Sequence, residues 1–168
     1  MRKVIIICIM FLILLPVTQT KAKTKVPEPT FEETVEAMVR EHRIMLDKLI
    51  AAWEHRQEEI NLLAEVIYHE NWHTDKEHLA AYYTGAVVMN RVNSKAWPNT
   101  VKTVLYQKGQ YSTTKLFFTK EIPQECYDMA RDIYKNGTPD VPENVIFQAM
   151  RPLGKTWKKV NTDYFCFG

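Results

Sequence analysis

The stretch LLAEVIYHE, residues 62–70, is the part of the sequence that says most about the fold. Its apolar residues recur at helical spacing and, with the preceding isoleucine, form one stripe: Ile60, Leu63, Ala64 and Ile67. With about 100° of rotation per residue, Glu70 lies on the flank of this stripe, whereas Glu65 and His69 point nearly opposite. The pattern therefore predicts an amphipathic helix that begins near residue 60 and sets Glu70 at the edge of the core.

A second amphipathic pattern precedes this helix, within residues 23–58. Thr30 and Glu33 form a capping box, which is typical of a helix start. Apolar residues then recur at helical spacing as far as about Arg56: Phe31, Val35, Met38, Val39, Leu46, Leu49 and Trp53. The apolar spacing does not hold a strict heptad, so we expect a separate helix packed on its own domain, with a dimeric coiled coil as the alternative.

The first 22 residues have the pattern of a secretory signal peptide. Arg2 and Lys3 precede an uncharged apolar run at 4–17, and a small-residue cleavage pattern ends at Ala22. This run is shorter than the roughly 20 residues that a helix needs to cross a bilayer. We therefore expect an exported protein; an uncleaved anchor, the only expected membrane contact, is the alternative.

The composition is that of one ordinary globular domain: 168 residues, 46% hydrophobic and 25% charged. Without the leader, 22 − 3 = 19 basic residues face 20 acidic ones, so the charge gives no reason to propose nucleic acid as a partner. Cys126 and Cys166 follow the leader. In an oxidising compartment they permit a disulfide, and two buried thiols that never meet are the equal alternative.

The rest of the chain predicts short helices and a small sheet, and hence a mainly helical α+β domain. Capping signals predict three helices: one opened by Thr74 and Glu77 that runs to about 92, one over 101–106, and one over 123–136. Residues 111–118 are expected to be extended. The aromatic and β-branched segments 145–147 and 164–167 are expected to pair as antiparallel strands.

Residues 69–73 spell HExxH, the pattern of a zinc metallopeptidase. Three features count against this interpretation. His73 lies in a run of weak helix formers, His69 points away from the apolar stripe, and the sequence offers no nearby third ligand. We therefore expect no metal and no cofactor, and keep the metallopeptidase as an alternative.

Glu70 alone supports another chemistry. Burial at the edge of an apolar stripe, next to Tyr68 and Trp72, disfavours the ionised carboxylate and raises its pKa. Such a group can donate a proton near neutral pH, as the general acid of glycosidic cleavage must. The alternative is a glutamate that only caps the helix or forms a salt bridge.

Six segments occur in an order that resembles the SleB/CwlJ-like cell wall hydrolase family: LLAEVIYHE (62–70), AVVMNRV (86–92), WPNTV (97–101), LYQKGQYS (105–112), VIF (145–147) and YFCF (164–167). The resemblance covers residues 59–168 and implies a catalytic domain of the lysozyme or lytic transglycosylase type with a small antiparallel sheet. It also implies cleavage of peptidoglycan between N-acetylmuramic acid and N-acetylglucosamine by a single glutamate, here Glu70. A secreted monomer in the cell wall or spore envelope of a Gram-positive-type bacterium is the corresponding expectation, with a non-catalytic wall-binding protein as the alternative.

The same resemblance suggests residues that bind the glycan. Gln110, Tyr111 and Ser112 match the GQ-aromatic-Ser stretch of the family, and they either line the glycan groove or have a structural role. Asn90 either binds an acetamido group or holds the site together. Trp72 and Phe147 either stack on sugar rings or belong to the core. Where the family has a small glycine-containing stretch after its glutamate, this chain has residues 71–75, which we expect to edge the cleft and to alter substrate preference.

Overall fold

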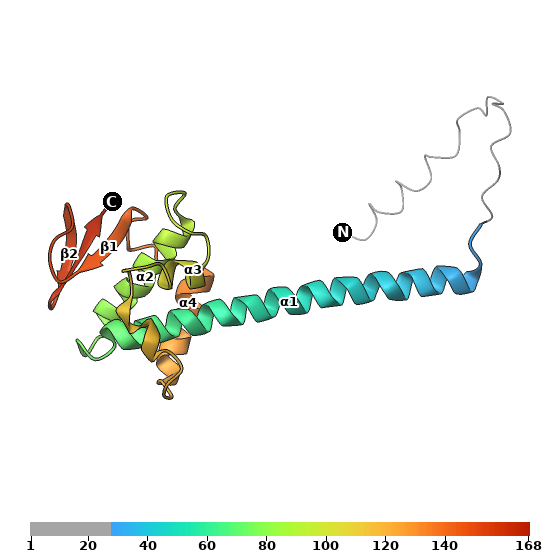
Figure 1. Ribbon diagram of the computed structural model, residues 1–168, viewed down its shortest axis with the longest axis horizontal. Coiled ribbons are helices and arrows are strands. Elements are labelled where there is room, and N and C mark those ends of the chain that lie inside the picture. Colours follow the sequence, from blue (N-terminus) through green and yellow to red (C-terminus); the bar gives the residue numbers. More distant parts are fainter. Residues whose placement is uncertain (1–27) are drawn as a thin grey trace, which may run out of the picture. The chain divides into compact units, whose positions relative to one another are not determined.

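The computed structural model describes residues 28–168, so the predicted leader lies outside the described residues (Figure 1). The chain divides into a unit that ends at Arg43 and a unit that spans Ile44–Gly168. The elements, in chain order, are α1 (Phe31–Asn71), α2 (Leu79–Asn93), α3 (Val101–Leu105), η1 (Ser112–Leu116), α4 (Gln124–Asn136), β1 (Val145–Ala149), β2 (Thr156–Val160) and β3 (Asp163–Phe167). No helix in this described part is long and apolar enough to cross a membrane.

Residues Phe31–Asn71 form one continuous helix, α1, so the expectation of two separate helices is wrong. Residues 57–59 contain no glycine or proline, and their long polar side chains favour continuation of the helix. The capping box at its start is confirmed: the Thr30 N–H donates to Glu33 Oε2 at 2.7 Å, and the Glu33 N–H donates to Thr30 Oγ1 at 3.2 Å. Glu59 has a different role, because its buried carboxylate accepts the Val101 N–H at 2.8 Å and so caps α3.

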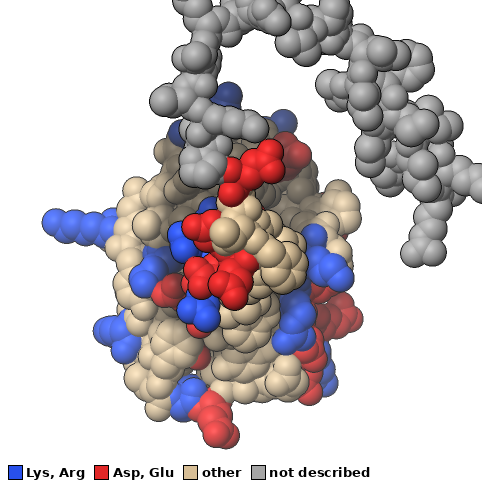
Figure 2. Space-filling view, turned by 90° about the vertical axis from the view of Figure 1, so that its right-hand side faces the viewer, with Lys and Arg blue, Asp and Glu red and all other residues tan. Residues whose placement is uncertain are grey.

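The apolar residues of α1 that belong to the second unit, Leu46, Leu49 and Trp53, are exposed, so the expectation that they pack on their own domain is wrong. Within the unit that begins at Ile44, Leu49 and Trp53 are each 61% exposed. Within the unit that ends at Arg43, Phe31, Val35 and Met38 are exposed as well. On the face drawn in Figure 2, acidic and basic side chains are interspersed with uncharged ones, and neither sign covers it.

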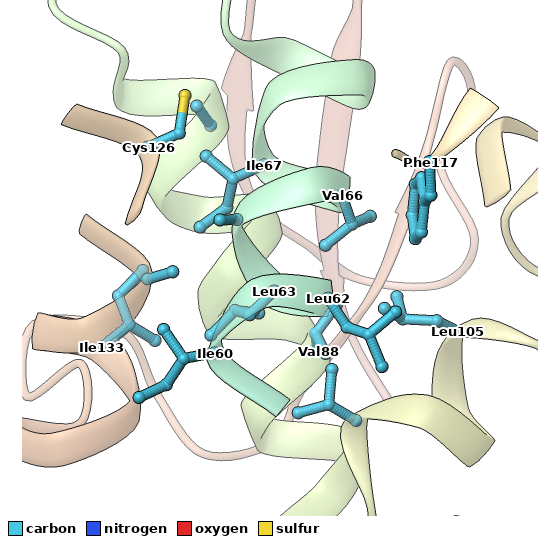
Figure 3. Close-up of a cluster of buried hydrophobic side chains, with 14 of the residues drawn as sticks. Ile60, Leu62, Leu63, Val66, Ile67, Val88, Leu105, Phe117, Cys126 and Ile133 are labelled. Carbon is cyan, nitrogen blue, oxygen red and sulfur yellow. The ribbon is translucent and has the colours of Figure 1, made fainter. Parts of the chain in front are cut away.

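The core forms where the last turns of α1 meet α2, α3 and α4. The predicted stripe is buried, with Leu63, Ala64 and Ile67 at 0% exposure. Figure 3 shows that Leu62 and Val66 turn toward Leu105 and Phe117, so a second side of the helix is also covered. Helix α1 is therefore buried on two sides here, not on one stripe alone.

The sheet has the order β1-β3-β2, and both pairs are antiparallel. Tyr83 and Val87 of α2 pack with Val145 and Phe165 of the sheet in a second buried cluster. The predicted pairing of β1 with β3 and the mainly helical α+β class are confirmed. Strand β2 was missed because its sequence, TWKKV, lacks a buried apolar alternation.

Two further expectations need correction. The segment expected to be extended, 111–118, instead contains the 3₁₀ helix η1. Helix α2 is not opened by Thr74 and Glu77: it begins at Leu79, and Asp75 accepts hydrogen bonds from the N–H groups of Leu79 and Ala80 at 2.8 and 3.1 Å.

The predicted helix over 123–136 is confirmed as α4. Cys126 and Cys166 are both buried and free.

Candidate active site

Glu70 lies in the last turn of α1 and is half-buried. Thr113 Oγ1 donates a hydrogen bond to Glu70 Oε1 at 2.5 Å. Burial raises the pKa of the Glu70 carboxyl, and the negative charge of Asp163 adds to this effect, while the Thr113 hydrogen bond and the His69 charge oppose it. The net result is a carboxyl group that keeps its proton to a higher pH than an ordinary glutamate, as a general acid requires.

The buried Arg91 contacts Tyr111, the residue that directly precedes η1. Arg91 Nε donates to the Ile146 carbonyl at 2.7 Å, and Arg91 Nη1 donates to the Tyr111 hydroxyl at 3.3 Å. Its guanidinium also lies 4.4 Å from the centre of the Trp97 ring. Arg91 thereby ties the start of η1 to α2 and β1. Burial raises the pKa of Tyr111 to about 12, so the hydroxyl stays protonated.

The predicted segment Gln110–Ser112 directly precedes Thr113, which contacts Glu70, and the charge of Glu70 raises the pKa of Tyr111 in addition to burial. Gln110 and Ser112 are exposed, whereas Tyr111 is buried against Arg91. The placement leaves two side chains of the segment accessible to a ligand. Binding of substrate by this segment stays a prediction.

The other predicted binding residues, Trp72, Asn90 and Phe147, contact other residues of the protein. Trp72 is only 8% exposed, and one face of its indole stacks on the His78 imidazole at 3.7 Å. The Asn90 amide donates to the carbonyls of Pro142 and Val145 at 2.9 and 3.0 Å. Phe147 lies edge-on to Trp97. These contacts favour structural roles for Trp72 and Asn90.

The loop after Glu70 is fixed at several points. Asn71 is buried and donates to Thr84 Oγ1 at 2.9 Å. Asn161, in the turn between β2 and β3, donates to the Thr74 carbonyl at 2.9 Å. This bond brings the start of β3, and with it Asp163, to the segment that follows Glu70. The expectation that this loop borders the site is consistent with its position.

Thr113 and Asp163 are the two site residues that sequence reasoning missed. Thr113 adjoins the recognised segment, so extending that segment by one residue would have included it. Asp163 had no such signal, because its approach to Glu70 depends on the β2–β3 hairpin.

The HExxH residues do not have the arrangement of a zinc site. The expectation that Glu65 and His69 point away from the core is wrong: Glu65 is 1% exposed, and His69 Nε2 lies 3.3 Å from Glu65 Oε2. Helix α1 ends at Asn71, so exposed His73 lies beyond the regular helix. Among residues 28–168, no group of three or more His, Cys, Asp or Glu side chains is placed to hold a metal ion.

A family model described as cell wall hydrolase matches residues 77–165. The matched segment runs from the approach to α2 into β3 and includes Tyr111, Thr113 and Asp163, while Glu70 lies seven residues before its start. Comparisons with curated proteins and with solved structures gave no match.

Proposed function

Because the chain belongs to the cell wall hydrolase family, we propose that it cleaves the glycan strands of peptidoglycan and that Glu70 is the proton donor. The observation that carries this proposal is the half-buried Glu70 carboxyl, whose pKa is raised by burial and whose Oε1 accepts the Thr113 hydroxyl. Export through the predicted leader, and a place in the wall or spore envelope, belong to the same proposal.

The mechanism that we propose needs one carboxyl group. Glu70 gives its proton to the glycosidic oxygen between N-acetylmuramic acid and N-acetylglucosamine as the bond to the anomeric carbon breaks. The Glu70 carboxylate then takes the proton of the muramic acid 6-hydroxyl, whose oxygen bonds to the anomeric carbon. The product is a 1,6-anhydro end, and no water is consumed. Thr113 stabilises the carboxylate that forms when the proton leaves.

Mass analysis of fragments released from purified peptidoglycan tests this function. We expect anhydro glycan fragments, which are about 18 Da lighter than hydrolysed ones because no water is added. We expect the same release in EDTA. Released peptides that disappear in EDTA would instead support the metallopeptidase, binding without release would support a wall-binding protein, and hydrolysed glycan ends would retain Glu70 as the acid but exclude the anhydro route.

The charge of Asp163 is expected to set the upper pH limit of activity. In Asp163→Asn, the negative charge that raises the pKa of Glu70 is lost, so this pKa falls. A general acid works below its pKa, and the alkaline limb of kcat/KM should therefore move to lower pH. The pH dependence of the release rate measures this shift.

Asp47→Asn, on the exposed part of α1, is the matched control and should leave the alkaline limb in place. If the alkaline limb of Asp163→Asn keeps its wild-type position or moves to higher pH, Asp163 does not raise the pKa of Glu70.

A further inference from the structure

A buried acid–base pair lies directly beside Glu70 and has no part in the mechanism above. The Glu65 and His69 side chains are 1% and 6% exposed, and Oε2 and Nε2 are 3.3 Å apart. Neither of these two atoms has a hydrogen-bond partner among the described residues. Removing two ionisable groups from water is costly, and apolar residues of similar size usually stabilise a core as well or better. Stability alone therefore does not account for this pair.

The His69 ring connects the pair to the segment that holds Glu70. It stacks on Phe117, with ring centres 5.9 Å apart and planes inclined by 22°. Phe117 is 7% exposed and closes η1, where its N–H donates to the Thr114 carbonyl at 3.3 Å. The same short helix carries Thr113, which donates to Glu70. A continuous series of contacts thus runs from Glu65 through His69, Phe117 and η1 back to Glu70.

We propose that Glu65 and His69 are positioning residues for Glu70. The Glu65 carboxylate holds the His69 imidazole against Phe117, and Phe117 fixes η1 so that the Thr113 hydroxyl reaches the Glu70 carboxyl. This inference rests on the proposed function, in which Glu70 is the proton donor. Within the family match it adds a role for residues that precede the matched segment.

Other titratable groups surround the pair. Burial raises the pKa values of Cys126 and Tyr127 on α4, and the charge of Glu65 raises them further. The Lys120 ammonium lies 4.7 Å from the centre of the Tyr68 ring, and Tyr68 in turn packs edge-on against His69. The charge of His69 lowers the pKa of Glu70, so loss of His69 should also be visible in the pH profile.

The double variant Glu65→Met/His69→Met removes both charges and the ring without leaving one partner buried alone. We expect it to unfold at the wild-type temperature or above. We expect kcat for glycan release to fall about 10-fold with KM unchanged, the effect of losing the Thr113 hydrogen bond to the charged carboxylate. The alkaline limb of the pH profile should move to higher pH, because the loss of the His69 charge and of the Thr113 bond both raise the pKa of Glu70.

Glu65→Met/His69→Phe restores a ring that can stack on Phe117. It should recover much of kcat, whereas the alkaline limb should stay shifted because the charge is still missing. If the first variant fails to fold, this one still tests the role of the ring: a folded Glu65→Met/His69→Phe protein whose kcat is about 10-fold low contradicts it. His55→Phe is the matched control: it makes the same exchange at an exposed histidine of α1 that lies outside the pair and outside the loop after Glu70, so kcat and the alkaline limb should not change.

The outcomes separate this inference from the proposed function. A wild-type protein that releases no glycan overturns the proposed function. An active wild-type protein whose folded Glu65→Met/His69→Met variant keeps the wild-type kcat overturns the positioning role alone, whatever the position of its alkaline limb, because the limb also responds to the lost His69 charge.

Discussion

Glu70→Gln should lower the rate of glycan release by about 10³-fold, within the range expected for loss of a general acid. Glutamine has nearly the same shape, and its Oε1 can still accept the Thr113 hydroxyl. It has no proton to give to the glycosidic oxygen, so the loss should appear in kcat and not in KM. Initial rates of fragment release from purified peptidoglycan measure the effect.

The same variant should not lose stability at neutral or alkaline pH. Because burial raises the pKa of Glu70 in the folded protein, the charged carboxylate is disfavoured by folding, and its stability cost grows as pH rises from the ordinary value of 4.5 through the folded value. Glu70→Gln should therefore unfold at or above the wild-type temperature at pH 8, and the difference should vanish in acid. Thermal unfolding at several pH values measures this.

Glu54→Gln, on the exposed part of α1, is the matched control for Glu70→Gln and should change neither the rate nor the unfolding temperature. Persistent lysis by a folded Glu70→Gln protein would remove Glu70 from its role as proton donor.

The elements predicted well from sequence are those with local signals. Helix α4 has Pro123 before its start and Gly137 after its end, and Gly137 adopts φ 73°, which favours glycine. The pairing of β1 with β3 follows from two short runs of aromatic and β-branched residues. These features depend on neighbours in the sequence, so they can be inferred without knowledge of the tertiary structure.

The expectations that were wrong depend on contacts between distant segments. A single-stripe helical wheel places Glu65 and His69 in solvent, but Phe117 arrives from a later segment and covers that side of α1. The opposite error occurs in the first part of α1, where apolar residues at helical spacing suggest packing, yet Leu49 and Trp53 are exposed. Helical periodicity indicates which residues share a face and not which segment, if any, covers it.

The residues of the candidate site also differ in whether local sequence or contacts between distant segments reveal them. The position of Glu70 at the edge of an apolar stripe suggests a raised pKa, but it equally fits a glutamate that only caps the helix. The order of the six segments that resemble the cell wall hydrolase family is what singles Glu70 out. Thr113 and Asp163 act on Glu70 only after η1 and the β2–β3 hairpin have brought them there. Sequence reasoning therefore points to the proposed proton donor but not to the groups that adjust its proton affinity.

Thr113→Val removes the hydroxyl that donates to Glu70 and keeps the shape of the side chain. A hydrogen bond to a charged group is worth about 1.5–3 kcal/mol, so kcat should fall about 10-fold or more as the carboxylate that forms in the transition state loses this support. The bond lowers the pKa of Glu70, and without it the alkaline limb of kcat/KM should move to higher pH. Thr113→Ser keeps a donor and should restore both quantities.

The shift in Thr113→Val is opposite in sign to that of Asp163→Asn, because one residue lowers the pKa of Glu70 and the other raises it. In the double variant Thr113→Val/Asp163→Asn the two shifts should offset each other, while kcat stays low because the support for the carboxylate is still missing. The combination thus separates the proton affinity of Glu70 from the stabilisation of its transition state. An alkaline limb of Thr113→Val at or below the wild-type position would show that the hydroxyl does not lower the pKa of Glu70. A Thr113→Ser variant as slow as Thr113→Val would show that the hydroxyl does not support the carboxylate in the transition state.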